Sequence, residues 1–187
     1  FGQGCEGEPL LNFDNIYKAI KIVRARTTKG IININTNGSI TKNIEKLIYV
    51  GLDSIRFSIF SFNKNIYNFY HKPKNFTFEN VLHSIKFSYS KNIHVSINLL
   101  HFPGINDNKQ ELKNLIYYKE KIGYNMIQFR NLNIDQDFLT TQLKKDNIYI
   151  NKNYLGLIAI ISKLKTKFKN NILFGYYNPY FENKKTT

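Results

Sequence analysis

The sequence predicts an α/β fold built on a parallel sheet, and two observations support this fold class. Short segments rich in β-branched and aromatic residues occupy residues 31–35, 54–59, 94–100 and 126–130, and this composition and length are typical of strands. A segment with apolar residues at helical spacing precedes each of them. Strands that alternate with helices across short connections form right-handed βαβ units. We therefore expect a sheet that is either open and doubly wound or curved into a (βα) barrel.

The predicted helices have recognisable ends. Gly30, Gly51 and Gly123 each stand just before a strand, where the end of a helix commonly needs a residue in the left-handed conformation. Side chains that can cap a helix N-terminus stand at Asn12, Thr41 and Thr77. The apolar stripes are Ile16–Ile20–Val23, Ile44–Leu47–Ile48, Phe78–Val81–Leu82–Ile85 and Leu112–Leu115–Ile116–Ile122.

The pattern changes after residue 137. Residues 139–154 are predicted to be a polar connector, and a further amphipathic helix begins at its end. The tail, residues 172–187, is rich in tyrosine and predicts a last strand with a cap that closes the barrel or shapes a pocket. We therefore divide the chain into a core, residues 1–137, and a C-terminal part, residues 138–187. The stripe of this further helix is Tyr154, Leu157, Ile158, Ile161, Leu164 and Phe168.

Composition limits the class of protein. The 187 residues are 42% hydrophobic, which is enough for one packed domain. Cys5 is the single cysteine, so internal disulfides are excluded and a reducing, cytoplasmic location is expected. No segment approaches the roughly 20 apolar residues of a membrane span. The formal charge of +14 is spread over the chain, and we therefore do not favour nucleic acid as the partner.

Polar motifs follow the predicted strands. Gly7–Pro9 stands before the first helix, and the others are Thr36–Gly38, Phe60–Asn63, Pro103–Asp107 and Asn131–Asp135. The carboxyl ends of parallel strands share one side of the fold, where ligands bind. We therefore expect these loops to line a single mouth.

The ordered motifs GEPLL, TNGS, GLDSIRFS, PGIND and IQFRNLNID resemble the body of a radical S-adenosylmethionine (SAM) enzyme, from Phe1 to about Asp137. The resemblance implies a TIM-like partial (βα) barrel that lacks its first βα unit. In this family a Cys-x3-Cys-x2-Cys loop after the first strand ligates a [4Fe-4S] cluster. Cys5 does not sit in such a motif, so we expect the sequence to be a fragment with its cluster cysteines upstream and no metal ligand of its own. Glu6 stands where the family usually has glycine.

The resemblance also implies a set of SAM-binding residues, and simpler roles stay open for several of them. Asn98 is either a SAM ligand or a structural hydrogen-bonding group of the barrel, and Arg56 is either a site residue on the face of Ser58 or a surface charge. Gly7, Pro9 and the Thr-Asn-Gly segment also fit ordinary turns. The implied set is Glu6, Gly7, Glu8 and Pro9 for the amino group, Thr36 and Asn37 at the next strand end, Ser58 for the ribose, Asn98 for the ribose or the carboxylate, the backbone near Ile127 and Gln128 for adenine, and Arg130 for the carboxylate.

The activity implied is reductive cleavage of SAM to a 5′-deoxyadenosyl radical, which takes hydrogen from a small-molecule or peptide substrate. A one-electron reductant such as flavodoxin or ferredoxin would be a partner. No catalytic side chain can be named, and His71, His83, His94 and His101 have no metal-ligand spacing; His101 is either a packing residue or a residue of the mouth. Two alternatives remain: a cluster-free barrel enzyme or binding module for a phosphorylated ligand, and an RNA-modifying protein whose aromatic tail stacks bases.

Overall fold

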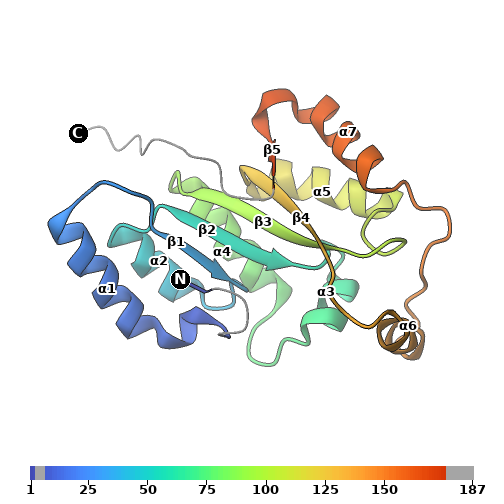
Figure 1. Ribbon diagram of the computed structural model, residues 1–187, viewed down its shortest axis with the longest axis horizontal. Coiled ribbons are helices and arrows are strands. Elements are labelled where there is room, and N and C mark those ends of the chain that lie inside the picture. The colour runs from blue at the N-terminus through green and yellow to red at the C-terminus, as the bar shows by residue number, and fades with distance from the viewer. Residues whose placement is uncertain (3–6, 176–187) are drawn as a thin grey trace.

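A computed structural model describes residues 1–2 and 7–175 (Figure 1). Cys5, Glu6 and the tyrosine-rich segment after Gly175 lie outside these residues. The strands are β1 (Asn33–Thr36), β2 (Ser54–Ile59), β3 (His94–His101), β4 (Met126–Asn131) and β5 (Leu173–Phe174). The helices are α1 (Phe13–Arg26), α2 (Thr41–Tyr49), α3 (Lys64–His71), α4 (Phe78–Ser90), α5 (Lys109–Ile122), α6 (Gln136–Lys145) and α7 (Leu157–Phe168), with 3-10 turns η1 (Pro9–Asn12) and η2 (Lys169–Asn171). The four strands predicted from the sequence are confirmed to within two residues.

The five strands form one parallel sheet in the order β1-β2-β3-β4-β5. Neighbouring strands in register place their side chains on the same face, and successive residues alternate between the faces. One face is apolar and carries Ile34, Ile55, Phe57, Ile59, Val95, Ile97, Leu99 and Ile127, all buried. The opposite face, which we call the inner face, carries Asn33, Asn35, Ser54, Arg56, Ser58, His94, Ser96, Asn98, Gln128 and Arg130.

Helices cover the apolar face in chain order. α1 packs against α2, α2 against α4, α4 against α5, and α5 against α7 (Figure 1). Their buried residues join those of the strands in one core cluster. Within the described part of the chain, the helices that bury the sheet lie on its apolar side, which leaves the inner face available for a ligand. Among the described helices, none combines the length and the apolar character that crossing a bilayer requires.

Two helices were not predicted. α3 follows β2, with the Asn63 side chain accepting hydrogen bonds from the first amides. α6 begins directly after the predicted Asn131–Asp135 loop and occupies the first part of the expected polar connector, as far as Lys145, which corrects that prediction. Two features stabilise α6. The Asp135 carboxylate caps the helix by accepting a hydrogen bond from Phe138 N at 2.8 Å, and Leu139 and Leu143 are buried.

The helix ends match the sequence analysis in part. Thr77 caps α4 in a capping box with Asn80, as predicted. Asn12 makes no capping bond, and Thr41 is the first residue of α2 instead of its cap. The predicted helix after residue 153 is confirmed as α7, but its buried residues are Ile160 and Leu164, and Ile158 is 85% exposed. The packed stripe therefore keeps Leu157, Ile161, Leu164 and Phe168 of the prediction, gains Ile160, and loses Tyr154 and Ile158, which are exposed.

Candidate functional site

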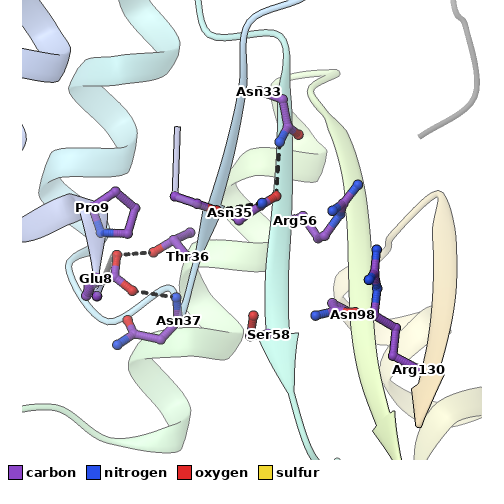
Figure 2. Close-up of a pocket in the computed structure, with 12 residues that line it drawn as sticks. Glu8, Pro9, Asn33, Asn35, Thr36, Asn37, Arg56, Ser58, Asn98 and Arg130 are labelled. Carbon is purple, nitrogen blue, oxygen red and sulfur yellow. Dashed lines mark hydrogen bonds between the residues drawn. The ribbon is translucent and has the colours of Figure 1, made fainter. Parts of the chain in front are cut away.

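A pocket of about 710 Å³ lies on the inner face near the carboxyl end of β1 and extends across to β4 (Figure 2). Eight of the ten predicted site residues line it: Gly7, Glu8, Pro9, Thr36, Asn37, Ser58, Asn98 and Arg130. Arg56 lines it too, so that residue belongs to the site and not to the outer surface. The sequence analysis missed Gly2, Asn33 and Asn35. The alternation of Asn33 and Asn35 with buried Ile34 was the signal that could have revealed the two asparagines.

The Glu8 carboxylate joins the loop before α1 to the loop after β1. It accepts hydrogen bonds from the Thr36 hydroxyl at 2.5 Å, from Asn37 N at 2.7 Å and from Leu10 N at 3.0 Å. Figure 2 shows this carboxylate between Pro9 and Asn37. Because three donors already occupy its oxygens, Glu8 acts on the pocket by fixing the positions of two loops.

The chain next to these loops pairs with the edge of β1. The Phe1 amino group donates to Asn33 O at 2.8 Å, and Asn35 N donates to Phe1 O at 2.9 Å. The Asn35 side chain donates to Gly2 O at 2.6 Å and accepts from Asn33 Nδ2 at 3.0 Å. Gly7 has φ +81°, and an added Cβ would meet nothing within 4 Å. Gly7 therefore needs glycine for its backbone conformation, in a segment whose peptide groups border the pocket.

The Thr-Asn-Gly segment is both a turn and a wall of the pocket. Thr36 Oγ1 accepts from Gly38 N at 3.0 Å, and Asn37 Oδ1 accepts from Ser39 N at 2.9 Å. Gly38 has φ +75°, and a Cβ there would lie 2.7 Å from the Phe57 ring. The tight turn brings the Asn37 side chain to the pocket while Gly38 packs against the core.

The far wall of the pocket comes from β2, β3 and β4. Ser58 is in register with Asn98, and Arg56 and Arg130 lie on the same face of their strands. The pKa of Arg56 is lowered by burial and, to a smaller extent, by the charge of Arg130. Among the described residues, Asn98 Oδ1 is buried and finds no hydrogen-bond partner. A buried amide oxygen of this kind is expected to have a partner, so the wall can accept a donor from a bound molecule.

The Gln128 side chain does not belong to the pocket lining, and the predicted place of this residue beside adenine stays a prediction. Its side chain lies on the inner face but is wholly buried, and Nε2 donates to Met126 Sδ at 3.8 Å. The strand alternation was correct; the side chain lies beneath the lining residues instead of among them.

Three of the predicted loops do not line the pocket. In the Pro103–Asp107 loop, Asn106 Nδ2 donates to Phe60 O at 2.8 Å and Asp107 Oδ1 accepts from Gly104 N at 2.6 Å, and both residues are buried. His101 lies 3.4 Å from Asp107, so it is a packing residue of this loop. The Asn131–Asp135 loop leads into α6 through its cap. The expected single mouth is therefore smaller than predicted, because these loops hold the strand ends together.

The Phe60–Asn63 loop is held by a buried carboxylate. Glu111 accepts from Ser61 Oγ at 2.7 Å and from Phe62 N at 2.6 Å, and burial raises its pKa to about 7. His71 Nε2 accepts from Phe60 N at 3.1 Å, and burial lowers the pKa of His71 to about 4. The loop after β2 is thus fixed by two titratable groups outside the pocket.

The family model of the radical SAM superfamily matches residues 5–116. The chain belongs to the radical SAM superfamily. It is 29% identical to an uncharacterized protein of Methanocaldococcus jannaschii over 194 residues, 92% of this chain and 66% of that protein.

Solved radical SAM structures share the fold of this domain. Methylornithine synthase matches with a TM-score of 0.60 at 12% identity, over 88% of this chain and 46% of that chain. A domain of pyruvate-formate lyase-activating enzyme from Bacteroides vulgatus gives 0.56 at 12% identity, over 76% and 90%. SuiB of Streptococcus suis, solved with SAM bound, gives 0.55 at 14% identity, over 90% and 35%. The chain spans less than two thirds of the length of the archaeal relative and under half of methylornithine synthase. The parallel α/β architecture is that of the TIM-like partial barrel of this superfamily.

The two cofactors of the superfamily fit the described residues differently. A pocket of about 710 Å³ is within the usual range for small-molecule sites, and the orphaned Asn98 oxygen suits a hydroxyl donor. By contrast, the described residues contain no group of three histidine, cysteine or acidic side chains that could hold a metal ion. The described residues therefore fit SAM and supply no ligands for an iron-sulfur cluster.

Proposed function

We propose that this radical SAM domain binds SAM in the inner-face pocket and serves the reductive cleavage of that cofactor. The observation that carries the proposal is the pairing of a polar sheet wall with the Gly7–Pro9 loop, which Glu8 fixes beside β1. Superfamily membership supports the general chemistry. With a reduced [4Fe-4S] cluster, SAM supplies a 5′-deoxyadenosyl radical that takes hydrogen from a substrate.

The residues of the pocket would divide the cofactor between them. We assign the backbone carbonyl of Gly7 as an acceptor for the ammonium group, because glycine has no side chain that would block a close approach. Ser58 and Asn98 face each other across β2 and β3 and would bind the ribose hydroxyls, with Asn98 Oδ1 as an acceptor. Thr36 and Asn37 close the side next to β1. The main tasks of these residues are to orient SAM and exclude water.

The substrate would be a small molecule or a peptide, and the reaction requires a one-electron donor such as flavodoxin or ferredoxin. The cluster ligands would lie outside the described residues. Because the fold alone does not define the substrate, the substrate has to be inferred from the side chains of the pocket.

Calorimetric titration with SAM tests the binding site. We expect Asn98→Ala to weaken SAM binding about three- to tenfold, because one hydrogen bond of about 0.5–1.5 kcal/mol is lost. Asn75→Ala, at an exposed asparagine, is the matched control and should bind as the wild type does. Equal affinity of both variants, or no SAM binding by the wild type, would contradict the proposal. Binding of phosphate without SAM would favour the cluster-free alternative.

The cluster can be tested on the same chain. With Cys5 as its single cysteine, the chain is expected to assemble no stable [4Fe-4S] cluster after anaerobic incubation with iron and sulfide, because such clusters are held by several thiolates. Visible absorption and iron content measure this. A stoichiometric cluster on this chain would show that its ligands are not upstream cysteines.

A further inference from the structure

The two side chains that we assign to the ribose, those of Ser58 and Asn98, are placed by the backbones of their strands. They lie opposite each other on β2 and β3 and line the pocket (Figure 2). Within the described part of the chain, Asn98 Oδ1 is buried without a hydrogen-bond partner, and no residue bonds to the Ser58 hydroxyl. The separation of the two side chains therefore depends on how the two strands are held.

β2 and β3 part immediately beyond these two residues. The last pair of their ladder is Ile59 and Leu99, after which β3 continues beside β4 as far as His101. Phe60 and Leu100 stand where the next pair would form, and each lies two residues, about 6.6 Å, beyond a residue assigned to the ribose. Backbone groups at the end of a ladder need other partners. The spacing of the strands near the pocket therefore depends on what binds Phe60 and Leu100.

The Asn106 side chain joins the two strands at this point. Its Nδ2 donates to Phe60 O at 2.8 Å and to Leu100 O, and its Oδ1 accepts from Phe102 N at 2.9 Å. Asn106 is 1% exposed. An amide nitrogen carries two hydrogens, and here each strand accepts a hydrogen bond from the same nitrogen. The amide thus closes the ladder where backbone pairing ends.

We infer that Asn106 is a positioning residue for the cofactor: its amide fixes the separation of β2 and β3 where they part, and so holds Ser58 and Asn98 at the spacing that two ribose hydroxyls need. The inference rests on the proposed function and adds to that site a residue outside the pocket lining. Groups that bind a ligand keep their geometry when neighbouring contacts fix them. Asn106 supplies that support from the loop after β3.

Asn106→Asp is the sharpest change, because it keeps the shape of the side chain and puts an acceptor oxygen where Nδ2 faced two carbonyl oxygens. Titration calorimetry should then show SAM binding weakened by about fivefold or more. Asn108→Asp is the matched control, since it adds the same charge two residues away and keeps the oxygen that caps α5. Because aspartate caps a helix as well as asparagine does, the control should bind SAM within about twofold of the wild type.

A double-mutant cycle separates positioning from a general loss of stability. In a Ser58→Ala/Asn98→Ala background, Asn106→Asp has no ribose-binding side chain left to position, so the further loss of SAM affinity should be below about twofold. A loss as large as in the wild-type background would overturn the inference, because Asn106 would then support the fold and not these two side chains.

NMR spectra without ligand test the same point independently of SAM binding and of how well Asn106→Asp folds. The Asn98 side-chain amide is identified by its loss in Asn98→Ala, and Ser58 is followed by its backbone amide. Asn106→Ala, which removes the donors without adding a charge, should shift both signals, and Asn108→Asp should shift neither. Unchanged signals in Asn106→Ala would overturn the inference. A wild type that binds no SAM would contradict the proposed function and the cofactor role of Asn106 together, and the two signals would still show whether Asn106 sets the positions of Ser58 and Asn98.

Discussion

At the scale of the single residue, Glu8 joins two segments that are 28 residues apart in the sequence, because its carboxylate accepts hydrogen bonds from Thr36 and Asn37. The family resemblance placed this residue at the cofactor as a source of negative charge. The hydrogen bonds give it a positioning role as well, because Glu8 fixes the loop that borders the pocket. A role of this kind is measurable in stability as well as in binding.

We expect Glu8→Gln to lower the free energy of unfolding by about 1–3 kcal/mol, because the amide replaces one acceptor oxygen with a donor that faces Thr36 or Asn37. Urea denaturation measures the change. Glu120→Gln, which removes an exposed partner of Lys167, is the control and should cost less than about 1 kcal/mol. A Glu8 variant as stable as that control would show that the two loops are held together by other contacts.

Two buried titratable groups, Glu111 and His71, make the free energy of unfolding depend on pH in opposite directions. The pKa of Glu111 is raised from 4.5 to about 7, so the folded state binds this proton more tightly and the stability contribution is lost as pH rises through that range. The pKa of His71 is lowered from 6.5 to about 4, so the unfolded state binds its proton more tightly and stability falls as pH drops from 6.5. Each slope is at most about 1.4 kcal/mol per pH unit.

The wild type is therefore expected to show a nearly flat stability profile between about pH 4.5 and 6.5 as far as these two groups decide it. Glu111→Gln should leave the His71 contribution, so that stability rises with pH. His71→Gln should leave the Glu111 contribution, so that stability falls as pH rises. Urea denaturation across this range measures both slopes, and parallel profiles for the two variants would contradict the assignment.

The residue types of the site were predictable from the sequence, but their partners were not. Polar side chains at Ser58, Asn98 and Arg130 appear where strand alternation and strand ends place them, and they do line the pocket. The sequence does not show that Glu8 is bonded to Thr36, or that Gln128 lies beneath the surface of the wall. Both facts depend on contacts between segments that are distant in the sequence, and local sequence patterns do not predict such contacts.

At the scale of the element, β1 to β4 and the longer helices were predicted correctly because each buries several apolar residues at a regular spacing. α3 and α6 were missed because they are short and bury little: Tyr67 in α3, and Leu139 and Leu143 in α6. These two helices instead join a second cluster of apolar residues around Phe60 and Phe102. Their formation depends on capping and on this tertiary contact more than on an amphipathic stripe.

Capping is the part of this explanation that can be tested. Asp135→Ala removes the acceptor for Phe138 N and should destabilise α6 by about 1 kcal/mol. Hydrogen exchange should become about fivefold faster in the amides of residues 139–145 and stay unchanged in α4. Asp137→Ala, which removes an exposed acidic residue of the same first turn, should have a smaller effect. Equal effects would assign the role to helix-dipole charge and not to the cap.

At the scale of the whole molecule, the formal charge of +14 comes from 27 lysine and arginine residues against 13 acidic ones. Some of the surface lysines are engaged by acidic residues, as in Lys64–Glu79 and Lys167–Glu120. A diffuse positive surface binds phosphate backbones weakly and without sequence preference.

We expect mixed tRNA to bind this chain only at low ionic strength and to be released by about 0.2 M salt, because the contacts would be non-specific phosphate contacts. Fluorescence anisotropy with labelled tRNA over a salt series measures this. A heparin-resistant complex that survives that salt concentration would favour the RNA-modifying alternative and would make the aromatic tail the next segment to vary.

The sheet has a polar inner face and an apolar outer face, so alternate residues of one strand are needed for different properties of the protein. Ile55, Phe57 and Ile97 are needed for folding, because the helices pack on them. Substitutions there should lower the amount of folded protein. Arg56 and Asn98, one position away, border a cavity and are constrained by the molecule that fills it. A mutational scan that measures only protein abundance should therefore show little effect of substitutions at Arg56 and Asn98. A library that varies every other strand residue could diversify ligand choice within an intact scaffold.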